Sequence, residues 1–255
     1  MTAVVLSGCN PNLNVAQICE AQPQMCTDVA QESWCRRTRS EFIHSRYINH
    51  RDGGADNMYQ LLTHAEDYNR CMSNVVHMVD KPGTQGDTNR GHWYTLSIQS
   101  LETLKQQSRD SSDPLLALYH WTRDKNPQAQ QRFLQAEQAG LVTSRKAMQL
   151  AAIYFAKQQP NKSHHYVKRL LTGVELSSRY DQELFELAAN SYKQQGQQAQ
   201  ALVFALLSNS QQISAEALAK HYRVAIDQLQ QIEQESDKVK RLLNDGEFDP
   251  EQWKM

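Results

Sequence analysis

The sequence predicts an all-α protein, with a disulfide-stapled helical region followed by an array of helical-hairpin repeats. Three observations predict this fold. Glycine and proline are scarce, at 10 and 7 of 255 residues, which disfavours a sandwich or barrel rich in tight turns. Apolar residues recur at helical spacing through much of the chain. The chain from Asp113 onward also repeats itself at an interval of 37 residues.

The composition excludes two classes of protein. Hydrophobic residues make up 40% and charged residues 22%, and the formal net charge is -1. No stretch approaches the roughly 18 apolar residues that a membrane-spanning helix needs. A nucleic-acid-binding protein usually carries a surplus of basic residues, which is missing here. We therefore expect neither an integral membrane protein nor a nucleic-acid partner.

The chain opens with a run that ends in Leu6-Ser7-Gly8-Cys9 and resembles a bacterial lipobox. In a lipobox the cysteine thiol is diacylated and becomes the new N-terminus. The small residues before Cys9 let a peptidase reach the bond, and residues 1–8 are expected to be residual signal peptide. This run carries no Lys or Arg, so we expect the true start to lie upstream. The alternative is a buried cysteine in an apolar strand.

Residues 9–27 are expected to form a lipidated tether and a short cysteine-containing turn. The polar run 10–14 suits a tether without regular structure. Two or three acyl chains, at about 0.8 kcal/mol per buried methylene, would anchor the protein to a membrane. Asn10 is not the aspartate that would favour retention in the inner membrane. The expected address is therefore the outer membrane, facing the periplasm.

The cysteine count supports an oxidising compartment. With Cys9 reserved for the lipid, an even number remains: Cys19, Cys26, Cys35 and Cys71. Four cysteines allow three pairings. We favour Cys19 with Cys26, which closes a short proline-containing turn, and Cys35 with Cys71, which ties two long helices together. The alternative is free thiols in a cytosolic protein. No Cys-x-x-Cys pair is present, so we expect no metal.

Residues 28–110 are expected to form an N-terminal helical region with three helices. The first should span about 28–49 and stop at the glycines 53 and 54. The second is the most clearly amphipathic segment, from about Met58 to Val79, and ends before Pro82. A third is expected over about 93–107.

Residues 111–255 are expected to form the α-hairpin repeat region. Positions that align at the interval of 37 include the triplets Leu115, Ala152 and Ala189, and Leu118, Phe155 and Tyr192. Small alanines allow paired helices to approach closely, and the aromatic residue fills the gap one turn later. The stretch 185–207 is the part that most resembles the tetratricopeptide class. A fourth, atypical unit near Ile213 would act as the terminal cap. The alternative is a plain helical bundle.

A second resemblance covers the whole chain. The lipobox, Ile18-Cys19 with Pro23 and Cys26, and the run Trp34-Cys35-Arg36 resemble a family of bacterial lipoproteins classified only as domain of unknown function 2989. That resemblance implies an address in the cell envelope. It implies no activity.

No catalytic or cofactor-binding motif stands out, so we expect no enzyme activity and no cofactor. The basic cluster Arg36-Arg37-x-Arg39 could meet anionic lipid headgroups, or it could be a solvated face paired with Glu32 and Glu41. Stacked helical hairpins typically bind other proteins. The leading hypothesis is therefore a periplasm-facing interaction scaffold with an envelope protein as partner. The runner-up is a peptidoglycan-associated binder or regulator of a cell-wall enzyme. Candidate partner-binding residues are Tyr119, Tyr154 and Ser191.

Overall fold

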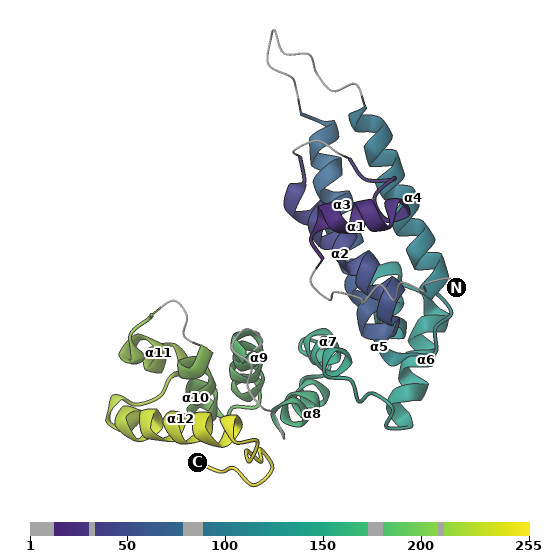
Figure 1. Cartoon of the computed structure of the whole chain (residues 1–255). Coiled ribbons are helices and arrows are strands. Elements are labelled where there is room, and N and C mark those ends of the chain that lie inside the picture. The colour runs from purple at the N-terminus through teal and green to yellow at the C-terminus, as the bar shows by residue number, and fades with distance from the viewer. Residues whose placement is uncertain (1–12, 31–33, 79–88, 173–180, 209–211) are drawn as a thin grey trace, which may run out of the picture. The chain divides into compact units, whose positions relative to one another are not determined.

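The computed structural model describes residues 13–30, 34–78, 89–172, 181–208 and 212–255 (Figure 1). Within these ranges every regular element is a helix, and most helices that follow one another pack as neighbours. The predicted all-α class is confirmed. The chain divides into two compact units, Met1–Phe133 and Leu134–Met255, and each is described by itself.

The chain enters the first unit through a short helix, α1 (Val15–Ala21). Asn14 caps it: its side-chain oxygen accepts from the Gln17 backbone N–H at 3.0 Å, and the Gln17 side chain accepts from the Asn14 N–H at 2.9 Å. This reciprocal pair is a capping box, and Ile18 is fully buried on the inner side. The region 9–27, expected to form a tether and a short cysteine-containing turn, therefore also contains a helix that begins at Val15.

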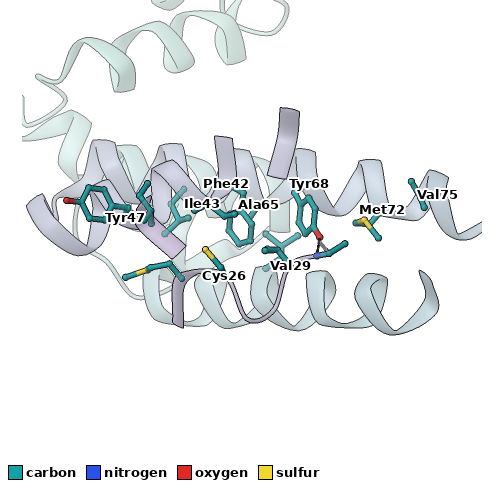
Figure 2. Packing of buried hydrophobic residues seen from close by; sticks show 14 residues of the cluster. Cys26, Val29, Phe42, Ile43, Tyr47, Ala65, Tyr68, Met72 and Val75 are labelled. Carbon is teal, nitrogen blue, oxygen red and sulfur yellow. Dashed lines mark hydrogen bonds between the residues drawn. The ribbon is translucent and has the colours of Figure 1, made fainter. Parts of the chain in front are cut away.

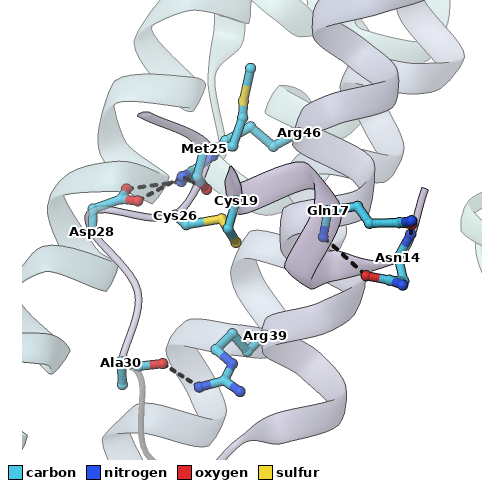
Figure 3. The surroundings of a disulfide bond; sticks show 9 residues. All are labelled: Asn14, Gln17, Cys19, Met25, Cys26, Asp28, Ala30, Arg39 and Arg46. Atoms are coloured by element: carbon cyan, nitrogen blue, oxygen red, sulfur yellow. Dashed lines mark hydrogen bonds and ion pairs between the residues drawn. A yellow bond between two sulfur atoms is a disulfide. The ribbon is translucent and has the colours of Figure 1, made fainter. Parts of the chain in front are cut away.

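A single-turn 3₁₀ helix, η1 (Pro23–Met25), follows α1 and reverses the chain. The Cys19–Cys26 disulfide closes this turn, with the Cα atoms 5.6 Å apart (Figure 3). The proline-containing turn and the first predicted cysteine pairing are both confirmed.

The helix expected from Asp28 begins later, because residues 28–30, a turn followed by a bend, are docked against other elements. The Ala30 N–H donates to the buried Tyr68 hydroxyl at 2.9 Å (Figure 2), and the Arg39 guanidinium donates to the Ala30 carbonyl (Figure 3). Helix α2 (Arg36–Asp52) starts after Cys35, whose backbone is left-handed at φ 54°. These contacts come from residues far along the chain, so the predicted start at Asp28 is wrong.

Asp28 is held by a charged network. Arg46 donates to both Asp28 carboxylate oxygens, at 2.6 and 2.9 Å (Figure 3). The Ser100 hydroxyl donates to one of the same oxygens. Burial alone would raise the pKa of Asp28, but the hydrogen bonds from Arg46 and Ser100 and the charge of Arg46 outweigh it. The pKa therefore lies below its ordinary value. The network ties the docked segment to helices on both sides of it.

Three long helices complete the framework of the first unit: α2, α3 (Ala55–Val76) and α4 (Arg90–Ser108). Gly53 and Gly54, at φ 64° and 88°, turn the chain from α2 into α3. A second disulfide joins the residue before α2 to the far part of α3, with the Cα atoms of Cys35 and Cys71 5.8 Å apart. The second predicted pairing is confirmed, and the second and third predicted helices match α3 and α4 within three residues.

The core of the first unit lies between these helices and the docked segment (Figure 2). The Phe42 and Tyr68 rings stack at its centre, 5.7 Å apart. Around them pack Ile18, Val29, Ile43, Leu61, Ala65 and Met72.

Three helix pairs follow one another, but their spacing is not the uniform interval of 37: the first helices of the pairs begin at 114, 145 and 181, which are 31 and 36 residues apart. Helix α5 (Pro114–Asp124) is followed by α6 (Pro127–Gln138), α7 (Arg145–Phe155) by α8 (Pro160–Leu171), and α9 (Asp181–Gln194) by α10 (Gln198–Ser208). The two pairs in the second unit pack tightly together. The boundary between the units falls within α6, although the sequence pattern places the start of the repeats at 111.

The residues that align at the interval of 37 are core residues. Ala152 and Ala189 lie in α7 and α9 and are almost fully buried, as are the aromatic Phe155 and Tyr192 three residues later. Small residues thus allow each helix to approach its neighbour, and one aromatic ring per pair fills the remaining space.

The second unit closes with α11 (Ala215–Tyr222), a 3₁₀ turn η2 (Ile226–Gln228), α12 (Leu229–Asn244) and a tail that folds back. In the tail, the Trp253 ring packs edge-on against Tyr192 and Phe204 and donates its indole N–H to Glu235 at 2.9 Å. Glu251 pairs with Lys168 at 2.7 Å. The tail therefore fastens α12 to the earlier helix pairs.

Over the part of the chain that the structure describes, no helix combines the length and the apolar character needed to cross a bilayer.

We expect the two disulfides to stabilise the protein unequally. Replacing Cys35 and Cys71 by serine should lower the free energy of unfolding by about 4 kcal/mol, because that bridge closes a loop of 36 residues. Replacing Cys19 and Cys26 should cost only about 2 kcal/mol, because the loop has 7 residues. Urea denaturation followed by circular dichroism gives both values. Equal losses of unfolding free energy in the two double variants would contradict the expected dependence on loop length.

Candidate functional site

A groove on the first unit runs between α2 and α3 and has a volume of about 580 Å³. Its lining combines basic, imidazole, hydroxyl and aliphatic side chains: Arg36, Arg37, Ser40, Glu41, His44, Ser45, Ile48, Gln60 and His64. The turn at Gly53 and Gly54 and the Cys35–Cys71 disulfide hold the two helices side by side, so the walls are fixed at both ends.

The basic cluster predicted near the start of α2 divides into two parts. Arg36 and Arg37 are exposed and line the groove, and Arg37 pairs with Glu41 at 3.0 Å. Exposed pairs one turn apart contribute only about 0.3–0.5 kcal/mol, so a ligand can displace this one at little cost. Arg39 points inward to the Ala30 carbonyl and is not part of the groove. Glu32 lies outside the described residues.

Two half-buried histidines face the same groove, one from each helix. His44 lies on α2 and His64 on α3. The Nδ1 atom of His64 is buried and makes no hydrogen bond within the described structure. A buried polar atom without a partner is costly, so this nitrogen is a natural contact for a bound group. The groove can therefore accept an apolar chain along its floor and an anionic group beside the arginines.

No group of three or more His, Cys, Asp or Glu residues is placed to hold a metal ion anywhere in the described ranges.

A second constellation joins a serine, a histidine and an aspartate. The Ser108 hydroxyl lies 2.9 Å from Nε2 of His120, and Nδ1 of His120 lies 2.8 Å from the Asp124 carboxylate. This is the order of contacts found in the catalytic triad of serine hydrolases. Lys105 also pairs with Asp124, at 2.9 Å. For Asp124, burial would raise the pKa, but the bonds from Lys105 and His120 lower it below its ordinary value.

The Ser108 hydroxyl and the His120 ring are too deeply buried to meet a substrate. They are 3% and 1% exposed, and the same hydroxyl lies 2.9 Å from the Leu104 carbonyl within its own helix. A substrate carbonyl needs to come within about 3 Å of the nucleophile. The contacts instead join the last turn of α4 to α5, so we interpret this constellation as a packing device.

Two of the three candidate partner-binding residues lie in the interior of the protein. Tyr119 is buried and its hydroxyl donates a hydrogen bond to the Glu66 carboxylate at 2.8 Å. Burial raises the pKa of this hydroxyl, and the hydrogen bond to Glu66 and its negative charge raise it further. Ser191 is also buried, 2.9 Å from Nδ1 of His164. A protein partner cannot reach either side chain. Tyr154 is half-buried and stays a prediction. The lipidation candidate Cys9 lies outside the described residues.

Comparison with known proteins gives one match. A family model described as "Protein of unknown function (DUF2989)" matches residues 6–206, which is most of the chain. Neither a curated protein nor a solved structure matches the sequence significantly. The family description assigns no activity to any residue of the groove.

Removing the Ser108 hydroxyl tests its packing role. Ser108→Ala should lower the free energy of unfolding by about 1–3 kcal/mol, because Nε2 of the buried His120 loses its partner. Ser73→Ala is the control, since its hydroxyl donates only to the Arg70 carbonyl at an exposed position on α3 and its loss should cost little. Chemical denaturation measures both. Labelling of Ser108 in the folded protein by a fluorophosphonate probe would overturn the packing interpretation.

Proposed function

This chain belongs to the family described as protein of unknown function (DUF2989), and we propose that it is an envelope lipoprotein that serves as a protein-interaction scaffold. In this proposal Cys9 carries the lipid, the outer membrane holds the anchor, and the helical units face the periplasm. The α2/α3 groove receives a segment of an envelope protein.

The disulfides are the observation that carries the proposed address. Apart from Cys9, every cysteine of the chain is paired: Cys19 with Cys26 and Cys35 with Cys71. Structural disulfides persist in oxidising compartments and are rare in the cytosol, where thiols are kept reduced. The one cysteine outside these pairs is the one in the lipobox-like run. This division of the cysteines supports a lipid-anchored protein beyond the cytoplasmic membrane.

The groove supports the scaffold role. It is open to solvent and offers exposed arginines at one end and aliphatic carbon along Ile48. An acidic segment with one or two apolar side chains has the complementary chemistry, and electrostatic attraction would steer it to Arg36 and Arg37. Helices held rigidly by a disulfide lose little entropy when such a segment binds.

Intact-mass analysis of the full-length protein from its native host tests the address. We expect acyl groups on Cys9 and a mass gain on reduction and alkylation that corresponds to two disulfides. The Cys9→Ser variant should lack the acyl mass and should no longer be found in the membrane fraction, but it should keep both disulfides. An unmodified Cys9 in a membrane-free protein would overturn the lipoprotein proposal.

Site-specific photo-crosslinking in cells tests the scaffold role. A photoreactive residue at Gln60, exposed within the groove, should capture an envelope protein. The same residue at Gln106, exposed on α4 outside the groove, is the matched control. Adding Arg36→Glu should abolish capture at Gln60, because the charge that attracts an acidic segment is reversed.

The runner-up function gives a different result in the same cells. A peptidoglycan-associated binder would co-sediment with purified sacculi and give no protein product specific to Gln60. That outcome would replace the scaffold proposal. Capture of the same proteins at Gln60 and Gln106 would also contradict it, because binding would not involve the groove.

A further inference from the structure

A second pocket lies in the second unit, where the turn between α9 and α10 meets the end of α11. It has a volume of about 450 Å³ and is lined by Lys193, Gln198, His221 and Arg223. Three of these four side chains are basic types, and no carboxylate is among them. None of the four was a candidate site residue in the sequence.

Two of the basic groups are held in direct contact. The Lys193 ammonium lies 3.0 Å from Nε2 of His221 and 5.1 Å from the centre of the Tyr222 ring. Lys193 can only donate, so Nε2 of His221 is the acceptor in this contact. Two groups that repel when both are charged are thus kept together at the pocket wall.

Arg223 occupies a backbone position that favours glycine. It ends α11 in the left-handed region, at φ 58° and ψ 39°, and its N–H caps the helix by donating to the Ala219 and Lys220 carbonyls. A residue with a Cβ atom pays roughly 1–2 kcal/mol for this conformation, and glycine avoids that cost. Arginine at this position presents an exposed guanidinium to the pocket, whereas glycine, the residue that best suits the turn, would present no side chain.

Gln198 adds a polar atom that lacks a partner. It is the first residue of α10, and its side-chain oxygen is buried and accepts no hydrogen bond from the described residues. The backbone N–H groups in the first turn of a helix also carry a partial positive charge. The Gln198 oxygen needs a donor, whereas the three basic side chains need an acceptor. One ligand satisfies both only if it carries an anionic oxygen with an O–H or N–H group nearby.

We propose that the pocket of Lys193, Gln198, His221 and Arg223 binds an oxyanion that bears a hydrogen-bond donor close to its charge. A carboxylate beside an amide N–H has this chemistry, as at the end of a peptide, and so does a phosphate that keeps one P–O–H group. The anion contacts Lys193 and Arg223, and the donor meets the Gln198 oxygen. This inference concerns a different unit from the α2/α3 groove and does not rest on the proposed function.

Heteronuclear NMR titration of the full-length protein at constant ionic strength tests the proposal. The probes are N-acetylglycine, N-acetylsarcosine, which differs by lacking the N–H, and inorganic phosphate. We expect saturable shifts of the Arg223 amide and the His221 ring with N-acetylglycine or with phosphate, and at least tenfold weaker binding of N-acetylsarcosine. Saturation by N-acetylglycine identifies a carboxylate ligand, and saturation by phosphate alone identifies a phosphate ligand.

Arg223→Gly is the decisive variant, because binding and folding should respond in opposite directions. Glycine suits the left-handed turn, so the thermal midpoint should stay level or rise, whereas affinity for the probe should fall by about tenfold or more. Lys240→Gln removes an exposed charge from α12 outside the pocket and should leave affinity unchanged.

Three results would overturn the proposal. The first is the absence of saturable shifts with every probe. The second is an Arg223→Gly protein that binds as tightly as the wild type. The third is equal weakening by Arg223→Gly and Lys240→Gln, because the shifts would then report only the net charge of the protein.

Discussion

The Cys35–Cys71 disulfide fixes the α2/α3 hairpin on which the first unit is built. Helices α1, α4 and α5 pack against one or other arm of that hairpin, and the docked segment 28–30 lies along it. Arg46 reaches out from α2 to Asp28, and Tyr68 reaches out from α3 to Ala30. Each contact forms only when α2 and α3 are correctly aligned along their length. The disulfide favours this alignment because it restricts the conformations that the unfolded chain can adopt.

Local patterns in the sequence predicted much of this unit, and they failed where contacts from distant residues decide the structure. Cysteine arithmetic and helical spacing predicted both disulfides, α3 and α4. The start of α2 was missed because Asp28 looks like a helix start, yet Arg46, about three helical turns beyond Cys35, holds Asp28 in a turn outside the helix. Helix α1 could have been found, since Asn14 and Gln17 have capping-box spacing.

The sequence predicted helices that pack in pairs, but two of the candidate partner-binding residues, Tyr119 and Ser191, are buried, for a physical reason. Residue types recur at a fixed interval when each repeat must fill the same interior space. Aligning the chain with itself therefore finds the residues on the buried faces of the helices. Ser191, which was expected to line a concave face, lies in α9 between the aligned Ala189 and Tyr192 and is also buried. The residues that line the two candidate pockets, such as His64 and Arg223, follow no repeat. The residues of each pocket come together only because separate helices converge there. A single sequence cannot reveal that convergence.

The folded-back tail has an optical consequence. Of the four tryptophans, Trp34, Trp93 and Trp121 belong to the first unit, and Trp253 is the only indole of the second. It sits against Tyr192, Phe204 and Phe248, in surroundings that change as soon as the tail leaves α12. With the other three indoles replaced by phenylalanine, the emission of this protein would become a built-in reporter of one half of the molecule, free of any attached dye.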